Sequence, residues 1–283
     1  MLAESHRLSV AISGGMPYPE NRHGSMVTCS LPREFMPLLE SEDPAPVIIQ
    51  NLGGDAKFFI ICDHAGCAVP RRLGRLGLPE AAFERHIAWD IGAGALARRL
   101  GEALDAPVIA QAYSRLVVDC NRAPDRDDFV PVVSDGTPIP GNVGLSPEAV
   151  AIRREAIYAP YHAAIAAALD ARGAARTILV LVHSFTPQLR GGALRPWWFG
   201  VLHDGRSPAS ARVLERLRRE ADGPVVGDNQ PYALDGTDFT VGHHGLARGL
   251  DYVELEVRQD LIAEPAGQAA VARRLARVLN EVD

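Results

Sequence analysis

The sequence predicts an α/β fold: a single layered domain with a central, mostly parallel or mixed sheet that helices cover on both faces. Short apolar runs alternate along the chain with longer amphipathic runs, as strands alternate with helices in such folds. The runs at residues 57–62 (KFFIIC) and 177–182 (TILVLV) are almost entirely apolar, which is typical of strands buried on both faces. No linker rich in Pro, Gly or Ser divides the body of the chain, so one domain is expected.

Residues 1–45 differ from the body of the chain. They contain clusters of Gly, Pro, Asn and Ser and show no sustained periodicity, which predicts an irregular N-terminal extension. From about Val47 the pattern changes, and residues 46–283 are expected to form the folded domain.

Local signals place the remaining elements. Ser146 suits a helix cap, Pro147 the first helical position and Glu148 the first turn. The helix that they open is expected to run to about Arg172, and Ser207-Pro208 opens another in the same way. The other expected elements are one or two helices over 80–104, strands at 108–111, 115–119, 197–202 and 251–257, a short extended segment at 224–227, and a helix over 267–282.

Composition and charge exclude several classes of protein. The formal charge of -6 argues against a general nucleic-acid surface, which needs clustered Lys and Arg. No stretch approaches the roughly 20 apolar residues of a spanning helix, and no signal peptide is visible at the N-terminus, so a cytoplasmic location is expected. The four cysteines form no C-x-x-C pair, which predicts reduced, mostly buried thiols: Cys29, Cys62, Cys67 and Cys120.

Unusual polar residues follow three of the expected strands. Asp63-His64-Ala65-Gly66 follows the strand at 57–62, and His183-Ser184 follows the strand at 177–182. Cys120-Asn121-Arg122 follows the strand expected at 115–119. Ligands of open α/β sheets bind outside the carboxyl ends of the strands. The sequence therefore predicts a functional site at one edge of the sheet.

His64 and His183 are the candidate metal ligands. Imidazole is the commonest metal ligand, and catalytic zinc typically takes three protein ligands and a water. The third ligand is expected on a helix over residues 86–90, where the i, i+4 spacing puts His86 and Asp90 on one face. Either could be the ligand, or His86 could support Asp90. The alternative for each histidine alone is a hydrogen-bonded structural role.

Glu254 and Glu256 alternate on the strand expected at 251–257 and so point to the same face. Either that face is solvated or it faces the site, where a carboxylate near a metal-bound water would make a general base. A further set of residues could bind an anion, because arginine makes paired, planar contacts with carboxylates. These residues are Asn121-Arg122, Arg195 and Arg258.

Several segments together resemble the N-formylglutamate amidohydrolase family, in the family's order and over about residue 48 to the C-terminus. The ordered set is specific, although no single motif is. Its members are Asp63-His64-Ala65-Gly66, His86-Ile87-Ala88-Trp89-Asp90, Ser114-Arg115-Leu116-Val117-Val118-Asp119-Cys120-Asn121-Arg122, His183-Ser184-Phe185-Thr186-Pro187, Arg195-Pro196-Trp197-Trp198, Gly227-Asp228-Asn229-Gln230-Pro231-Tyr232 and Glu254-Leu255-Glu256-Val257-Arg258-Gln259-Asp260-Leu261.

The resemblance implies a zinc-peptidase-like (phosphorylase/hydrolase-like) fold and hydrolysis of N-formyl-L-glutamate, or of a related small N-acyl amino acid. Residues 46–283 would be the catalytic domain. By the pattern of cell-wall amidases with this fold, a divalent metal, zinc, would be held by His64, Asp90 and His183. Asp90 departs from that pattern, which has Glu at this position. The family's E-x-R-Q-D-L register selects Glu256 as the catalytic glutamate.

The implied reaction uses a water whose pKa the metal lowers to about 7, with Glu256 as general base. Substrate would be bound by Asn121, Arg122, Arg195, His244 (in an H-x-x-x-R-G-L segment) and Arg258. Two other classes stay open. A metal-independent serine hydrolase could use Ser184 beside His183, although no G-x-S-x-G elbow is present. A non-catalytic protein that binds an acidic metabolite would keep the arginines without needing the histidines.

Overall fold

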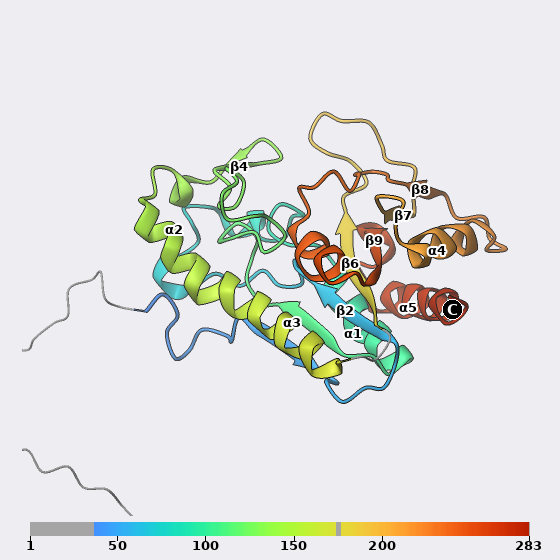
Figure 1. Cartoon of the computed structure of the whole chain (residues 1–283). Helices are drawn as coiled ribbons and strands as arrows, with labels where there is room; N and C mark the ends of the chain where they lie inside the picture. The colour runs from blue at the N-terminus through green and yellow to red at the C-terminus, as the bar shows by residue number, and fades with distance from the viewer. Residues whose placement is uncertain (1–36, 174–176, 283) are drawn as a thin grey trace, which may run out of the picture. The chain divides into compact units, whose positions relative to one another are not determined.

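The computed structural model describes residues 37–173 and 177–282 (Figure 1). Most of the N-terminal extension expected from the sequence, residues 1–36, lies outside the described residues. Residues 37–45 form no helix or strand, and the first strand begins at Val47. All the elements described below belong to the unit from Pro37 onwards.

A seven-stranded sheet in the order β1-β3-β2-β6-β9-β7-β8 forms the centre of this unit. The four strands β3, β2, β6 and β9 run parallel, whereas β1 and β7 are antiparallel to their neighbours β3 and β9. The α/β fold with a mostly parallel, mixed sheet is confirmed. The strands are β1 (Val47–Gln50), β2 (Phe58–Cys62), β3 (Val108–Gln111), β6 (Ile178–Phe185), β7 (Phe199–Leu202), β8 (Val226–Asp228) and β9 (Asp251–Arg258), and a separate hairpin joins β4 (Val133–Ser134) to β5 (Thr137–Pro138).

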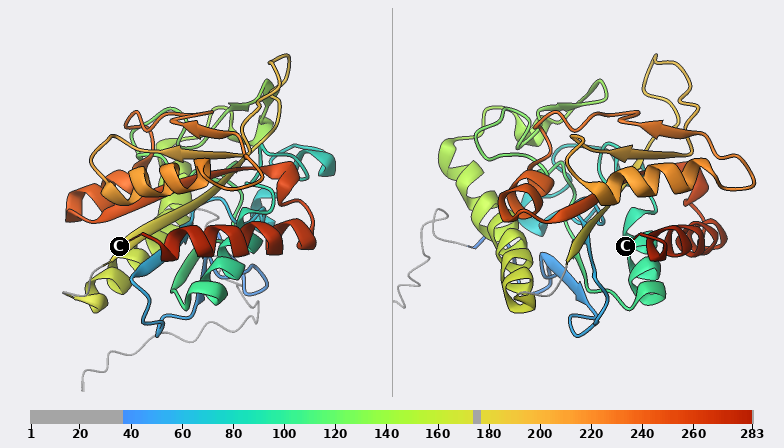
Figure 2. Two further views of the ribbon diagram at one scale, coloured as in Figure 1. Left: turned by 90° about the vertical axis from the view of Figure 1, so that its right-hand side faces the viewer. Right: turned by 45° about the vertical axis from the view of Figure 1, so that its right-hand side comes forward.

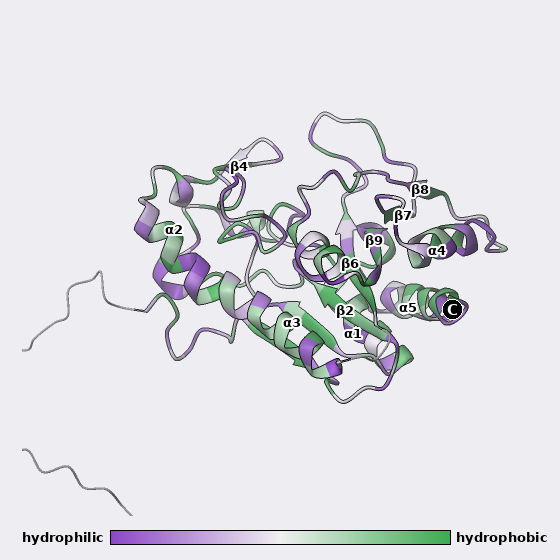
Figure 3. Ribbon diagram, in the orientation of Figure 1, coloured by the Kyte–Doolittle hydropathy of each residue, from purple (hydrophilic) through white to green (hydrophobic). Residues whose placement is uncertain are grey.

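Helices cover both faces of the sheet (Figure 2). In β2, Ile60 and Cys62 pack into the core under one group of helices, while Phe59 and Ile61 pack into the core on the opposite face. This explains why the β2 sequence is apolar without alternation, and the central strands are correspondingly hydrophobic in Figure 3. The first face carries α1 (Ala93–Leu104), α4 (Pro208–Arg218) and α5 (Pro265–Asn280), and the second carries α2 (Pro147–Arg153) and α3 (Ala159–Arg172).

The helix starts expected from the sequence are confirmed. The Ser146 hydroxyl accepts a hydrogen bond from the backbone N–H of Ala149 at the start of α2, and Ser207 caps α4 in the same way. A π-turn over Arg154–Tyr158 joins α2 to α3, so the helical run extends to Arg172 as expected.

The helix expected over 80–104 is only partly present. Glu80–Ala82 forms one 3₁₀ turn, residues 83–92 form turns and irregular structure, and α1 begins at Ala93. Gly92 precedes α1 with φ 81°, and a Cβ there would lie 2.2 Å from the carbonyl oxygen of Ile262. The close contact and the left-handed backbone require glycine and place the helix start after it. The expected i, i+4 helical pairing of His86 with Asp90 is therefore wrong.

The strand expected at 115–119 is also wrong. This segment is buried but forms turns and irregular structure. Its backbone groups bond to partners outside any sheet: Arg115 N–H donates to the carbonyl of Ala88, and the carbonyl of Leu116 accepts from the Asn142 side chain. The side chain of Arg153 donates to the carbonyl of Val117. Burial without a strand is possible because these partners satisfy the polar backbone.

Within the described residues, no helix is both long and apolar enough to cross a membrane. The three cysteines there are free: Cys62 and Cys120 are buried, whereas Cys67 is exposed. Cys29 lies outside the described residues.

Candidate metal centre

Adjacent parallel strands deliver the two candidate histidines to one place. Strands β2 and β6 pair with Ile61 opposite Leu181, and His64 follows β2 by two residues while His183 lies within β6. The turn that carries Asp90 is fixed to the same edge, because its backbone N–H donates to the carbonyl of His64 at 2.9 Å. The carboxyl ends of the parallel strands therefore meet at the site, as the sequence predicted.

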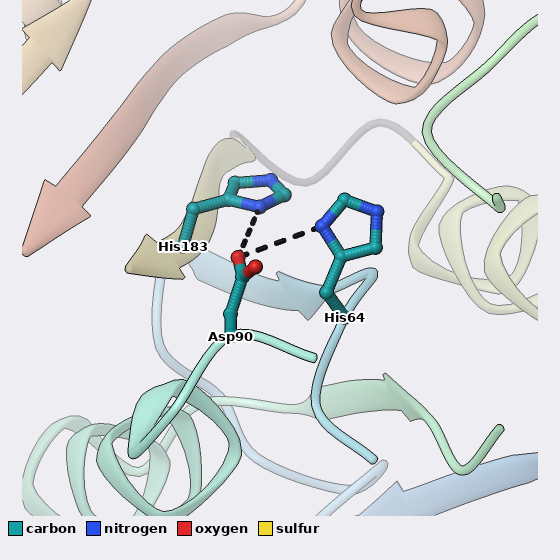
Figure 4. Close-up of side chains that lie close together, drawn as sticks. All are labelled: His64, Asp90 and His183. Atoms are coloured by element: carbon teal, nitrogen blue, oxygen red, sulfur yellow. Dashed lines mark hydrogen bonds and ion pairs between the residues drawn. The ribbon is translucent and has the colours of Figure 1, made fainter. Parts of the chain in front are cut away.

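His64, Asp90 and His183 form a buried cluster in which one donor atom of each lies within 4.8 Å of the others (Figure 4). Oδ2 of Asp90 is 3.0 Å from Nδ1 of His183 and 3.5 Å from Nδ1 of His64. His86 is outside this cluster, and its Nε2 lies 3.3 Å from Oδ2 of Asp135. Of the two candidate third ligands, the fold brings Asp90 to the histidines.

Each histidine has a further carboxylate near its Nε2 atom. Nε2 of His64 lies 2.7 Å from Oδ1 of Asp119, and Nε2 of His183 lies 3.4 Å from Oδ2 of Asp63. A carboxylate that is hydrogen-bonded as Asp119 is to His64 orients a metal-binding imidazole and fixes its tautomer, which leaves Nδ1 of His64 free to coordinate. The sequence reasoning gave Asp63 and Asp119 no role of their own, although both lie in the segments that carry the family resemblance.

The residues fit a divalent metal. Nδ1 of His64 is buried and has no hydrogen-bond partner among the described residues. Two imidazoles and one carboxylate are the donor set of several catalytic zinc sites. Burial raises the pKa of Asp90, but His64 and His183 outweigh it and hold that pKa below its usual range. The Asp90 carboxylate is thus anionic, as a ligand must be.

Glu254 and Glu256 are buried side by side on β9, and their face lies toward the site. Oε1 of Glu254 is 3.9 Å from Nε2 of His183, and Glu256 is opposite His183 in the strand register. Burial raises the pKa of Glu256 to about 8 and the pKa of Glu254 well above its usual value. Of the two alternatives that the sequence left open, the solvated face is wrong.

A pocket of about 440 Å³ opens beside the cluster. Arg115, which the sequence reasoning left out of the candidate binding residues, lines the pocket and contacts the cluster: its guanidinium is 3.6 Å from Asp90 and 2.7 Å from Asp119. The sequence feature that could have identified Arg115 is its position in the same motif as Asn121 and Arg122. The pocket is lined by His86, Asp90, Arg115, Arg122, Ser184, Phe185, Thr186, Tyr232, Ala233, Asp235, Thr237 and Asp238.

Of the candidate arginines, one lines this pocket and a second contacts one of its lining residues. Arg122 lines it and bonds to Asp128 at 2.9 Å. Arg195 lies against the lining residue Tyr232: its Nη1 donates to the Tyr232 hydroxyl at 3.0 Å, and its guanidinium carbon is 4.9 Å from the ring centre. Within residues 37–173 and 177–282, no carboxylate comes within ion-pair distance of Arg195, so its charge is available to an anion.

Three other candidate residues do not line the pocket. Asn121 is buried and its side chain donates to Asp238. His244 is buried against His162, with 2.9 Å between their ring nitrogens. Arg258 forms a bidentate pair with Asp260.

Ser184 does line the pocket, but its hydroxyl donates to the carbonyl of Ile91 at 2.9 Å. Its neighbour His183 points with Nδ1 to Asp90 instead. Successive residues of a strand face opposite ways, and the serine–histidine contact that a serine hydrolase requires is not formed.

Known proteins resemble this chain along most of its length. The model of the N-formylglutamate amidohydrolase family matches residues 56–263. A gene product of Agrobacterium tumefaciens with a known crystal structure is 34% identical, with 87% of this chain and 97% of that chain covered and a TM-score of 0.82. An N-formylglutamate amidohydrolase from Ralstonia eutropha has the same fold, at 19% identity, 83% and 96% coverage and a TM-score of 0.62. Curated proteins give no match. The family model, which matches residues 56–263, shows that this chain belongs to the N-formylglutamate amidohydrolase family.

Proposed function

We propose that this protein is a metal-dependent amidohydrolase that cleaves the amide bond of N-formyl-L-glutamate or a related N-acyl amino acid. One observation carries the proposal. The Nδ1 atoms of His64 and His183 both face Asp90, while a carboxylate stands at the Nε2 atom of each ring. This is the arrangement of a metal site with its supporting carboxylates, and it lies beside a pocket with cationic residues.

His64, Asp90 and His183 would hold the metal, which we propose to be zinc. When bound, zinc would supply a Lewis acid that polarises the amide carbonyl and makes a water nucleophilic near neutral pH. Burial of the site excludes bulk solvent and strengthens the electrostatic interactions within it.

Glu256 is our proposed general base. It lies opposite His183 on the neighbouring strand, and its Oε2 has no hydrogen-bond partner among the described residues. The pKa of Glu256 would fall from about 8 beside a bound cation, so its ionised carboxylate would take the proton of the attacking water and then give it to the leaving amine. Glu254 is less exposed, at 1% against 7% for Glu256. We therefore assign Glu254 to the support of His183.

Arg195 and Arg122 are our proposed contacts for the substrate carboxylates. Arginine has no acceptor atom, so the Tyr232 oxygen accepts from Arg195 and its own hydrogen points elsewhere. We propose that this hydroxyl donates to the substrate in the pocket that Tyr232 lines. Arg115 stays with Asp90 and Asp119 and offsets their negative charge. The cytoplasmic location and the assignment of residues 46–283 as the catalytic domain stay predictions.

The test is a hydrolysis screen on protein of known metal content. Purified protein is assayed with N-formyl, N-acetyl and larger N-acyl derivatives of glutamate, glutamine and aspartate, before and after treatment with a chelator. Stoichiometric metal and turnover that is lost with the metal and restored by zinc would support the proposal. Turnover that survives complete removal of the metal would contradict it. Tight binding of acidic ligands without any turnover would favour the non-catalytic alternative.

A further inference from the structure

The cleft beside the metal centre extends beyond the first pocket. A second pocket of about 390 Å³ shares four lining residues with the first: His86, Arg115, Arg122 and Tyr232. The first pocket, at about 440 Å³, already falls in the range of about 300–1,000 Å³ that accommodates drug-sized ligands. An N-formyl amino acid is smaller than such a ligand, so the second pocket is additional space along the same cleft.

Several charged groups that line the second pocket are paired with other side chains. Asp128 pairs with Arg122, and Asp119 bonds to His64 and Arg115. The two cations of this pocket, Arg115 and Arg122, are shared with the first pocket, and the side chains that line only the second include Asp119, Asp128 and Asp135, so a ligand carboxylate would meet anions in this part of the cleft.

Asp135 also has partners, and its contacts hold in place segments that line the second pocket. Its side chain lies 3.4 Å from the guanidinium of Arg85 and 3.3 Å from His86, and it accepts from the backbone N–H of Arg190 at 3.1 Å. Two separate segments, at residues 85–86 and at Arg190, are thereby tied to the turn of the β4–β5 hairpin. The second pocket is thus bounded by positioned segments rather than by one free loop.

In contrast, apolar side chains that line the second pocket are exposed to solvent. Val133 on β4 is 55% exposed and Leu189 is 36% exposed, and both line the second pocket together with Pro131. Exposed apolar side chains that gather at a cleft next to a reaction site mark a binding surface for an apolar group.

We propose that this second pocket is a subsite for an apolar extension of the substrate. The physiological substrate would then be an N-acyl amino acid that is longer than N-formylglutamate by an aliphatic chain of several carbons. The inference rests on the proposed function, because it places the extension relative to the metal centre. The aliphatic chain can belong to the acyl group or to the amino acid, and the experiment separates the two.

The test measures kcat/KM along two series of substrates with the metal-loaded enzyme. The acyl series is N-formyl-, N-acetyl-, N-butanoyl- and N-hexanoylglutamate. The amino acid series is N-formylnorvaline, N-formylnorleucine and N-formyl-2-aminooctanoate. We expect kcat/KM to rise about three- to fourfold for each added methylene in one series, the effect of burying that group. The series that rises identifies the side of the amide bond that carries the extension.

Variants connect the effect to the pocket. Val133→Asp should abolish the rise, measured as the ratio of kcat/KM for the longest to that for the shortest substrate. Val225→Asp is the matched control, because Val225 is 45% exposed but lines neither pocket. We expect it to keep the wild-type ratio. A flat or falling profile in both series, or an unchanged ratio in Val133→Asp, would overturn the inference.

A binding measurement separates this inference from the proposed function. The Kd of N-hexanoylglutamate, of N-formylglutamate and of the longest and shortest members of the amino acid series is determined by calorimetry. If N-formylglutamate is hydrolysed but chain length changes neither kcat/KM nor Kd, the subsite is wrong and the proposed function stands. If nothing is hydrolysed but a longer chain binds more tightly in wild type and not in Val133→Asp, the subsite stands and the hydrolase proposal is wrong. Absence of both effects overturns both.

Discussion

Oδ1 of Asp119 lies 2.7 Å from Nε2 of His64, on the side of the imidazole ring opposite the Nδ1 atom that faces Asp90. Burial raises the pKa of Asp119, but Arg115 and His64 outweigh it and hold that pKa well below its usual range. The carboxylate is therefore a permanent acceptor for a proton on Nε2. His64 is kept in the tautomer whose Nδ1 can bind a metal.

The first prediction follows from this contact. Asp119→Asn should lower the affinity for zinc about 10- to 100-fold, because the amide is a weaker acceptor and orients the ring less firmly. Zinc affinity is measured by competition with a chelator of known affinity. Asp204→Asn is the control, since Asp204 bonds to Tyr252 and Arg206 instead of a metal-site histidine. Equal zinc affinity in Asp119→Asn and wild type would show that the contact only stabilises the fold.

The second prediction concerns the ligands themselves. His64→Ala and His183→Ala should each lose bound metal and activity together, because each removes one donor of the proposed three-residue site. Metal content is measured by elemental mass spectrometry on folded protein. His203→Ala serves as a control, because His203 pairs with Asp228 away from the cluster. Stoichiometric metal with near-normal turnover in either site variant would remove that histidine from the proposed ligand set.

The third prediction separates the two buried glutamates of β9. Glu256→Gln should keep its metal and its fold while kcat falls about 10²- to 10⁴-fold, the usual effect of losing a positioned general base. Glu254→Gln should lower kcat much less, because we assign Glu254 to the support of His183. Steady-state kinetics and metal content are measured on both variants. A larger loss in Glu254→Gln would reverse the two roles.

The fourth prediction concerns substrate carboxylates. A hydrogen bond to a charged group contributes about 1.5–3 kcal/mol, so Arg195→Met and Arg122→Met should each lower kcat/KM for N-formylglutamate roughly tenfold to a hundredfold. Tyr232→Phe should cause a smaller loss. Arg258→Met should also be milder, because Arg258 pairs with Asp260 and lines neither pocket.

N-Formylglutamine is the matched substrate for this prediction, since it lacks one carboxylate. The arginine that contacts the side-chain carboxylate should matter much less with N-formylglutamine, because the interaction is already absent. Arg206→Met is the control variant, as Arg206 is exposed and pairs with Asp204. Equal losses on both substrates for both pocket arginines, with no wild-type preference for the diacid, would contradict the glutamate assignment and leave the hydrolase assignment intact.

The fifth prediction concerns stability at acidic pH. Burial lowers the pKa of His162 to about 4 and that of His244 to about 3, against an ordinary value of 6.5. Below pH 6.5 the unfolded chain binds protons at these residues that the folded protein does not bind. The free energy of unfolding should therefore fall as the pH drops from 6.5 to about 4, by about 2 kcal/mol between pH 7 and pH 5 for His162 alone.

Urea unfolding at pH 7 and pH 5 checks this. The variant His162→Phe should lose less stability over that interval than wild type, since one of the buried histidines is gone. The comparison of variant with wild type cancels the contributions of the metal-site histidines, which are present in both. An identical loss in both proteins would show that His162 does not titrate as its burial implies.

Local sequence determined most of the fold. The local pattern placed the helix caps at Ser146 and Ser207 and the apolar strands β2 and β6, because each of these features depends on only a few neighbouring residues. The strands and helices at 108–111, 197–202, 251–257 and 267–282 also form close to their expected bounds. The four-residue strand β1 and the two-residue strands β4 and β5 were not expected, because such short segments carry little periodicity.

By itself, the sequence also placed His64 and His183 at the same edge of the sheet, because residues that follow neighbouring parallel strands must meet there. The tertiary structure decided the rest of the site. Asp90 lies with the histidines because its backbone N–H bonds to His64, and Arg115 is held by the carbonyl of Ala88. Such hydrogen bonds join segments far apart in sequence and leave no local pattern. The direction of a side chain in an irregular segment is therefore set by distant partners, whereas a strand or helix sets it by its own period.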